Sequence, residues 1–440
     1  MNLSDCFYVI VLYLGNGLPI LALSTFFAVL PVLQEDIGLS HTQRAKMISM
    51  APILYCTAKL ICGAALDRYG PRITWSLSLA MGSVFLIGIA TAHADFPSVV
   101  VACLVFFRFT CGFLWTSLMV SLSSRFRGSS FTTVLGVVST SSRVGAVLGG
   151  YLASFFLARS AAGWRNAVYV SAAACFIHAI VLAMFLVPVT KADVQADTNP
   201  AHAGSNSNTD ASATTSIGRK PDKTDRQPRT TEVLAVALSS PRMLLVVLFA
   251  MLSYPVFTLE KLFPSYFVEQ GMPAADAARV SSGVPAGMAL VLPLAGLVIG
   301  RSPKFAAGLV SVGIGGSGVL MLLLSQLNFG SSSPTEAVHV QRVAQTILFA
   351  IGFCYAPAVY FPVAKFGNAY GGDRNKGLII SMIDCAGNLS ISLFNLVLPY
   401  LVSSVGWAGV MTMMAMMLVA SAVVIAYLQW WQLVEPVQVS

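Results

Sequence analysis

The stretch Gly63-Ala-Ala-Leu-Asp67-Arg68-Tyr-Gly70-Pro71-Arg72 places three charged residues between two long apolar runs. The runs cover residues 47–66 and 73–92. Each has about the 20 apolar residues that a helix needs to cross a bilayer. The stretch therefore predicts a charged loop that joins two membrane helices, and similar apolar runs fill most of the chain on both sides of it.

The composition agrees with a membrane protein. Of the 440 residues, 56% are hydrophobic and 10% are charged, whereas a soluble domain carries roughly 25% charged residues. This excludes a soluble enzyme, a disordered scaffold and a nucleic-acid binder. The eight cysteines lie nearly all in apolar runs and show no CxxC or metal-ligand spacing. We therefore expect a multi-pass membrane protein without disulfides, metal or cofactor.

Twelve apolar runs predict an all-α protein with twelve transmembrane helices in two six-helix bundles. The first run is too long for a signal peptide and follows Asp5, so we expect it to be retained. The bundles correspond to residues 1–190 and 233–440. The runs are 7–33, 47–66, 73–92, 96–120, 129–157, 166–188, 243–268, 280–300, 305–327, 338–363, 377–402 and 406–431.

A polar segment, residues 191–232, separates the bundles and predicts a flexible cytoplasmic linker, because its Asn, Ser, Thr and Asp residues cannot bury a core. Its basic end, 219–229, either binds anionic lipid head groups or marks the cytoplasmic side. With both termini inside, fifteen Lys and Arg lie in cytoplasmic connections and six on the opposite side. Positive charge favours the cytoplasmic side. We therefore expect cytoplasmic termini, in a plasma or inner membrane rather than an organelle.

Two short patterns recur in the second half of the chain. A shortened copy of the charged loop, 296–304, follows the eighth run, with Gly300 in place of Asp67. Gly163-Trp164 follows the fifth run, and Gly406-Trp407 follows the eleventh. Parallel six-helix repeats are one plan of secondary transporters, with the substrate site between the halves.

The loop resembles the signature G-x-x-x-D-R-x-G-x-R of the major facilitator superfamily. Arg108 and Gly112 are similar to a second motif of that family, and the segment 145–150 is similar to a third, with Ala146 in place of its proline. The resemblance covers the whole twelve-span plan. It implies the major facilitator fold, with two pseudo-symmetric bundles around a central cavity.

A narrower resemblance is to the organophosphate:phosphate antiporters. It rests on Tyr55 to Gly63, on Ile383-Asp384 with Gly387, and on Gly406-Trp407. Those antiporters hold phosphate with arginines in spans 1 and 7. Here span 1 has no charge and span 7 has Glu260 and Lys261, so their specific substrate is not carried over.

Six charged residues lie inside the predicted spans, at a cost of about 2.5–3.5 kcal/mol each near the bilayer centre. Three bases, Lys59, Arg108 and Arg143, lie in the first half. They predict an anion-binding site, because guanidinium and ammonium groups bind phosphate and carboxylate. Alternatively, the two arginines bind backbone carbonyls and hold helices together.

Two acids are candidates for coupling, Asp384 and Glu260. Asp384 either carries a proton or forms a fixed pair with a base such as Lys59, and Glu260 is expected at the outer mouth. Lys261 points about 100° away from Glu260 on a helix and is expected to reach the lipid head groups. Uncharged candidates for substrate contact are Asn16, Tyr254, Tyr355, Asn388 and Asn395, each of which can equally pair with a neighbouring helix. His178 is expected to be a packing residue, and the prolines of spans 7, 8 and 10 predict bends.

The loop residues Gly63, Asp67, Arg68, Gly70 and Arg72 are expected to form a gate. Asp67 and Arg68 would bond the facing end of span 11 and close the cytoplasmic side until the halves rock. No ATP-binding motif and no nucleophile–base constellation occurs, so we expect no enzyme.

We expect a secondary transporter, acting as a monomer by alternating access on a small polar, anionic metabolite, with a proton or counter-anion as a second partner. One alternative is proton-coupled transport of a neutral or zwitterionic solute, such as an amino acid or a drug. Another is a receptor or scaffold that does not transport. The charges placed at depth favour transport, because a scaffold does not need them.

Overall fold

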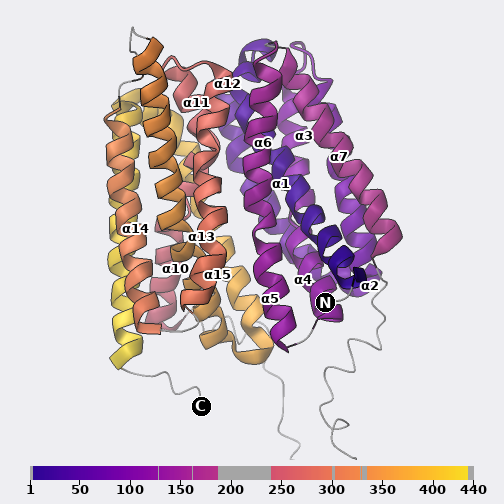
Figure 1. The fold of residues 1–440 in the computed structure, drawn as a ribbon, viewed down its shortest axis with the longest axis vertical. Helices are drawn as coiled ribbons and strands as arrows, with labels where there is room; N and C mark the ends of the chain where they lie inside the picture. The colour runs from indigo at the N-terminus through magenta and orange to yellow at the C-terminus, as the bar shows by residue number, and fades with distance from the viewer. Residues whose placement is uncertain are drawn as a thin grey trace, which may run out of the picture.

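The computed structural model is entirely helical over the residues that it describes, which are 3–126, 128–160, 162–186, 239–299, 303–327, 329 and 334–434. The helices form two groups, coloured indigo to magenta and salmon to yellow in Figure 1. The first group is α1 (Leu3–Ile37), α2 (His41–Ala90), α3 (Pro97–Cys111), α4 (Leu114–Arg125), α5 (Gly128–Ser139), α6 (Ser141–Leu157) and α7 (Gly163–Phe185). The second is α10 (Pro241–Ser253), α11 (Val256–Glu269), α12 (Ala274–Ser281), α13 (Gly283–Ile299), α14 (Pro303–Ser325) and α15 (Pro334–Val434).

Nine helical segments of the described residues are long and apolar enough to cross a bilayer. One of them, Ile379–Gln429, contains two of the predicted spans. The all-α membrane architecture is therefore confirmed, while the count of twelve stays a prediction. The predicted boundaries of the linker lie outside the described residues.

Glycine explains two turns within the long helices. Gly70 interrupts α2 with φ 73°, between the two runs that were predicted as separate spans. Gly406 has φ 69° within α15 and separates its last two predicted spans. Side chains other than glycine rarely adopt this left-handed backbone, so these two residues let the chain reverse direction.

Four membrane passes consist of two helices with a break of one or two residues between them. The break between α10 and α11 occurs at Tyr254 and Pro255, as the prolines predicted. The breaks between α3 and α4 and between α5 and α6 have no proline. At the second, the hydroxyls of Ser139 and Thr140 donate to the carbonyls of Leu135 and Val137, at 2.6 and 2.8 Å. Such bonds compete with the helix and bend it.

The two groups meet along several helix pairs. In particular, α2 packs on α15, α6 packs on α12 and α13, and α1 packs on α11 and α12. Helix α1 begins, α7 ends, α10 begins and α15 ends at the lower end of Figure 1. The segment between α7 and α10 therefore starts and finishes at the end of the molecule where the described chain begins and ends.

Candidate functional site

An ion pair joins the two groups of helices near the middle of α2. Lys59 on α2 contacts the Asp384 carboxylate on α15, so the pairing alternative is confirmed. The Tyr254 hydroxyl donates to Asp384 Oδ1 at 3.2 Å, and Asn388 Nδ2 donates to the Asp384 carbonyl at 2.8 Å. The lysine and aspartate side chains are only 15% and 23% exposed. Asp384 is therefore held by partners from both halves.

The local sequence explains why Tyr254 reaches this aspartate. A Cβ at Gly387 would overlap the Tyr254 ring, so the glycine one turn after Asp384 makes room for the tyrosine. Tyr254 lies at the break between α10 and α11, where Pro255 begins the next helix. The Asp384–Gly387 spacing quoted in the sequence therefore has a packing reason.

Tyr55 holds two cations on one aromatic ring. Lys59 Nζ and Arg108 Cζ each lie 4.8 Å from the ring centroid, within the range of cation–π attraction. A Cβ on Gly112 would come within 2.8 Å of the Tyr55 carbonyl, so this glycine allows the chain after α3 to approach α2. Arg108 is 8% exposed, and within the described part of the chain it has no carboxylate at ion-pair distance.

A second ion pair crosses the boundary through Arg143 on α6. Its guanidinium lies 3.6 Å from Glu260 on α11, and both side chains are about nine-tenths buried, at 14% and 13% exposed. The guanidinium also lies 5.4 Å from the Phe257 ring. Glu260 therefore neutralises an arginine between the halves, which the sequence did not predict.

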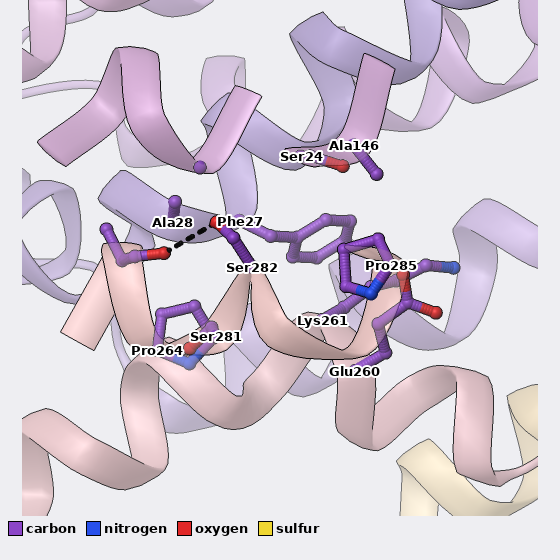
Figure 2. Close-up of a pocket in the computed structure, with 12 residues that line it drawn as sticks. Ser24, Phe27, Ala28, Ala146, Glu260, Lys261, Pro264, Ser281, Ser282 and Pro285 are labelled. Carbon is purple, nitrogen blue, oxygen red and sulfur yellow. Dashed lines mark hydrogen bonds between the residues drawn. The ribbon is translucent and has the colours of Figure 1, made fainter. Parts of the chain in front are cut away.

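Lys261 faces the boundary between the halves. Figure 2 shows it beside Glu260 and Phe27 in a small pocket formed by α1, α6, α11, α12 and α13. Its ammonium lies 5.8 Å from the Phe27 ring. The free volume of about 40 Å³ is enough for water. The prediction that Lys261 reaches the head groups is therefore wrong, because α11 directs this face of the helix toward α1.

The buried charges near this boundary do not balance. Four bases, Lys59, Arg108, Arg143 and Lys261, accompany two acids, Asp384 and Glu260. Arg108 and Arg143 are close enough for their charges to act on Lys261. Arg108 and Lys261 are the two bases in this set for which the described residues provide no ion pair.

The uncharged candidates have partners within the protein. Asn16 Nδ2 donates to Ser141 Oγ at 2.8 Å, which ties α1 to α6. Tyr355 is fully buried and donates to the Ser253 carbonyl at 2.7 Å. Asn395 Nδ2 donates to the Ile48 carbonyl at 3.3 Å, and a His178 ring nitrogen lies 2.9 Å from the Val11 carbonyl. Contact of Asn16, Tyr355 or Asn388 with substrate stays a prediction.

The predicted gating loop is described in part. Gly70 makes the turn, Arg72 Nε donates to the Ala183 carbonyl of α7 at 2.6 Å, and Arg68 lies over the Tyr69 ring at 5.4 Å. Arg72 therefore anchors the loop within its own half. The side chain of Asp67, the surroundings of Gly63 and the second-half residue Gly300 lie outside the described part, so the gate stays a prediction.

The outer ends of the two halves repeat one arrangement. Trp164 Nε1 donates to Asp36 at the end of α1, at 3.1 Å. Trp407 Nε1 donates to Glu269 at the end of α11, at 2.6 Å. Each tryptophan follows the glycine of a Gly-Trp pair, so the recurring pair marks equivalent positions at the start of the last helix in each half.

Glu269 also connects the halves, because it lies 3.6 Å from Arg44 at the start of α2. Arg44 donates to Gln34 at 3.0 Å. Burial lowers the pKa of Arg44, and the Glu269 carboxylate opposes that shift. These residues and Trp407 line an outer pocket of about 320 Å³. Neither the pocket nor its ion pair was predicted; the acid beside each Gly-Trp pair was the available signal.

Known proteins resemble the chain at several levels. Residues 12–372 match the model of the Major Facilitator Superfamily. A hexuronate transporter of Bacillus subtilis (strain 168) is 24% identical over 142 residues, which is 32% of this chain and 33% of that protein. The match thus spans about a third of the relative's length.

Solved structures share the fold over nearly the full length. A bacterial homologue of the human lysosomal transporter Spinster, inward-facing and unoccupied, has a TM-score of 0.69 at 13% identity, covering 99% of this chain and 100% of its own. A D-xylose–proton symporter has a TM-score of 0.68 at 15% identity, covering 95% and 97%. With the family model spanning most of its residues, the chain belongs to the major facilitator superfamily, as a multi-pass membrane transporter and not an enzyme.

Proposed function

We propose that the protein is a secondary active transporter of a small anionic metabolite. The observation that carries the proposal is the surplus of buried positive charge, four bases against two acids at the boundary of the halves. Unpaired buried charge is costly. An anion bound by Arg108 and Lys261 would neutralise it, with guanidinium hydrogen bonds to the anion.

The polarity of the boundary supports alternating access. All three ion pairs described between the halves, Arg44–Glu269, Arg143–Glu260 and Lys59–Asp384, take the base from the first half and the acid from the second. An anion near Arg143 competes with Glu260 for its guanidinium. We infer that this competition weakens the link between the halves and allows them to rock around the bound substrate.

The hexuronate transporter adds a chemical argument, since a hexuronate is a sugar that carries a carboxylate. The alternative of proton-coupled transport of a neutral solute relies on Asp384 or Glu260 as proton carrier. Both already have a cationic partner, so they serve better as fixed ion-pair partners. The scaffold alternative leaves the cost of the unpaired bases without a purpose.

Further parts of the proposal concern the surroundings. We assign the end that carries the chain termini to the cytoplasm, in a plasma or inner membrane, on the distribution of bases. We propose a monomer of two bundles, residues 1–190 and 233–440, joined by the linker 191–232. A proton or a counter-anion is the second transported partner, and lipid head groups contact the basic end of the linker.

Counterflow in proteoliposomes tests the function. The panel contains glucuronate and glycerol 3-phosphate as anions, glucose as the neutral counterpart of glucuronate, and alanine as a zwitterion, with and without a pH gradient. We expect exchange of at least one anion and none of glucose or alanine. Exchange confined to glucose or alanine would show that the anion assignment is wrong, and exchange of no solute would oppose the transporter proposal for this panel.

A further inference from the structure

Two thiols meet across the boundary of the halves. Cys56 on α2 and Cys385 on α15 hydrogen-bond to each other. Both are free and half-buried, so a small reagent can reach them. Neither has a place in the anion site proposed above.

The position of this pair gives it a consequence for transport. Cys56 precedes Lys59 by three residues, and Cys385 directly follows Asp384. The thiols therefore lie beside the ion pair that links α2 to α15. The same two helices also contact each other further out, through Asn395 and the Ile48 carbonyl. Rocking of the halves requires these helices to move relative to each other.

We propose that Cys56 and Cys385 form a redox latch, in which a peroxide oxidant joins them by a disulfide and stops transport. One sulfur attacks hydrogen peroxide and becomes a sulfenic acid, with release of one water. The second thiol attacks that sulfur, the S–O bond breaks, and a second water leaves. Two thiols lose two electrons and two protons, and one peroxide becomes two waters.

The geometry favours this bond over other thiol pairs. Hydrogen-bonded thiols need only a short approach to reach the S–S bond of about 2.05 Å. Cys111 and Cys175 are near each other but lie on α3 and α7 of the same half, so a bond between them would not join the halves. Cys62 donates to the Phe113 carbonyl.

The latch rests on the proposed function only through its effect on transport, so the test has two separate readouts. A protease site inserted within 191–232 is cut after the full-length protein is in proteoliposomes, which separates the halves on a denaturing gel. After hydrogen peroxide, a disulfide keeps them in one band until dithiothreitol is added. The second readout is counterflow of whichever solute of the panel exchanges.

We expect peroxide to produce the joined band and to reduce exchange by the joined fraction, with both effects reversed by dithiothreitol. Cys56→Ser and Cys385→Ser should abolish both effects, while Cys354→Ser, on the same helix as Cys385, should retain them. Halves that separate fully after peroxide would overturn the latch whatever the substrate, and so would joined halves that exchange at the full rate. Absence of exchange in the reduced protein would instead count against the proposed function, because the gel would still report the bond.

Discussion

Neutralising one member of the Lys59–Asp384 pair should damage the protein more than neutralising both. In Asp384→Asn, Lys59 keeps its charge but loses its carboxylate, and the Tyr254 hydroxyl loses a charged acceptor at 3.2 Å. In Lys59→Gln, the carboxylate instead remains without its cation. The double variant leaves two neutral amides that can hydrogen-bond.

The burial of the pair sets the magnitude. Breaking a buried ion pair by removing one partner costs about 3–5 kcal/mol. Side-chain exposures of 15% and 23% place each single change at the lower end, at about 3 kcal/mol in the free energy of unfolding. Replacing both partners of such a pair is often neutral. We therefore expect the double variant to lie within about 1 kcal/mol of the wild type, with a coupling energy that is clearly different from zero.

The assay is reversible unfolding in mixed micelles of mild detergent and dodecyl sulfate, followed by tryptophan fluorescence. Counterflow of the same four proteins adds a functional readout. If Asp384 acts as a fixed partner, the double variant recovers exchange that Asp384→Asn loses. Additive losses in the two single variants would refute the pairing as a source of stability. Failure of the double variant to exchange, with its fold intact, would instead favour Asp384 as a proton carrier.

Two further perturbations test the packing. Trp407→Phe removes the indole hydrogen bond to Glu269 and should cost about 1.5–3 kcal/mol in unfolding free energy; an unchanged value would contradict a contribution of the outer brace. Gly145→Ala places a Cβ against the Gly17 carbonyl and should lower the melting temperature, because α6 must move away from α1. Gly136→Ala is its control, since a Cβ there meets no atom within 4 Å; equal shifts in both variants would contradict the close contact.

Several features followed from the sequence because they depend on local chemistry. Apolar run length identified the membrane passes, and the turns at Gly70 and Gly406 fall between predicted spans. The cost of buried charge drew attention to Lys59 and Asp384, and the pair is present. The two Gly-Trp pairs indicated the repeat, and the tryptophans hold matching acids.

Other features depend on which way a helix faces, and these were missed. A membrane helix is apolar on the protein side and on the lipid side, so its sequence carries no polar stripe to orient it. Lys261 was therefore assigned to the head groups, although it faces Phe27. The Arg143–Glu260 and Arg44–Glu269 pairs join residues that only the packing of the halves brings together.

The central claim is that Arg108 and Lys261 hold the anionic group of the substrate. The most direct measurement is the KM for exchange of the transported anion in wild type, Arg108→Gln and Lys261→Gln, with Arg159→Gln as a control at an exposed base. Loss of a charged hydrogen bond costs about 1.5–3 kcal/mol, so KM should rise at least about tenfold in the first two variants. The control should keep the wild-type value. An unchanged KM in both Arg108→Gln and Lys261→Gln would contradict the account.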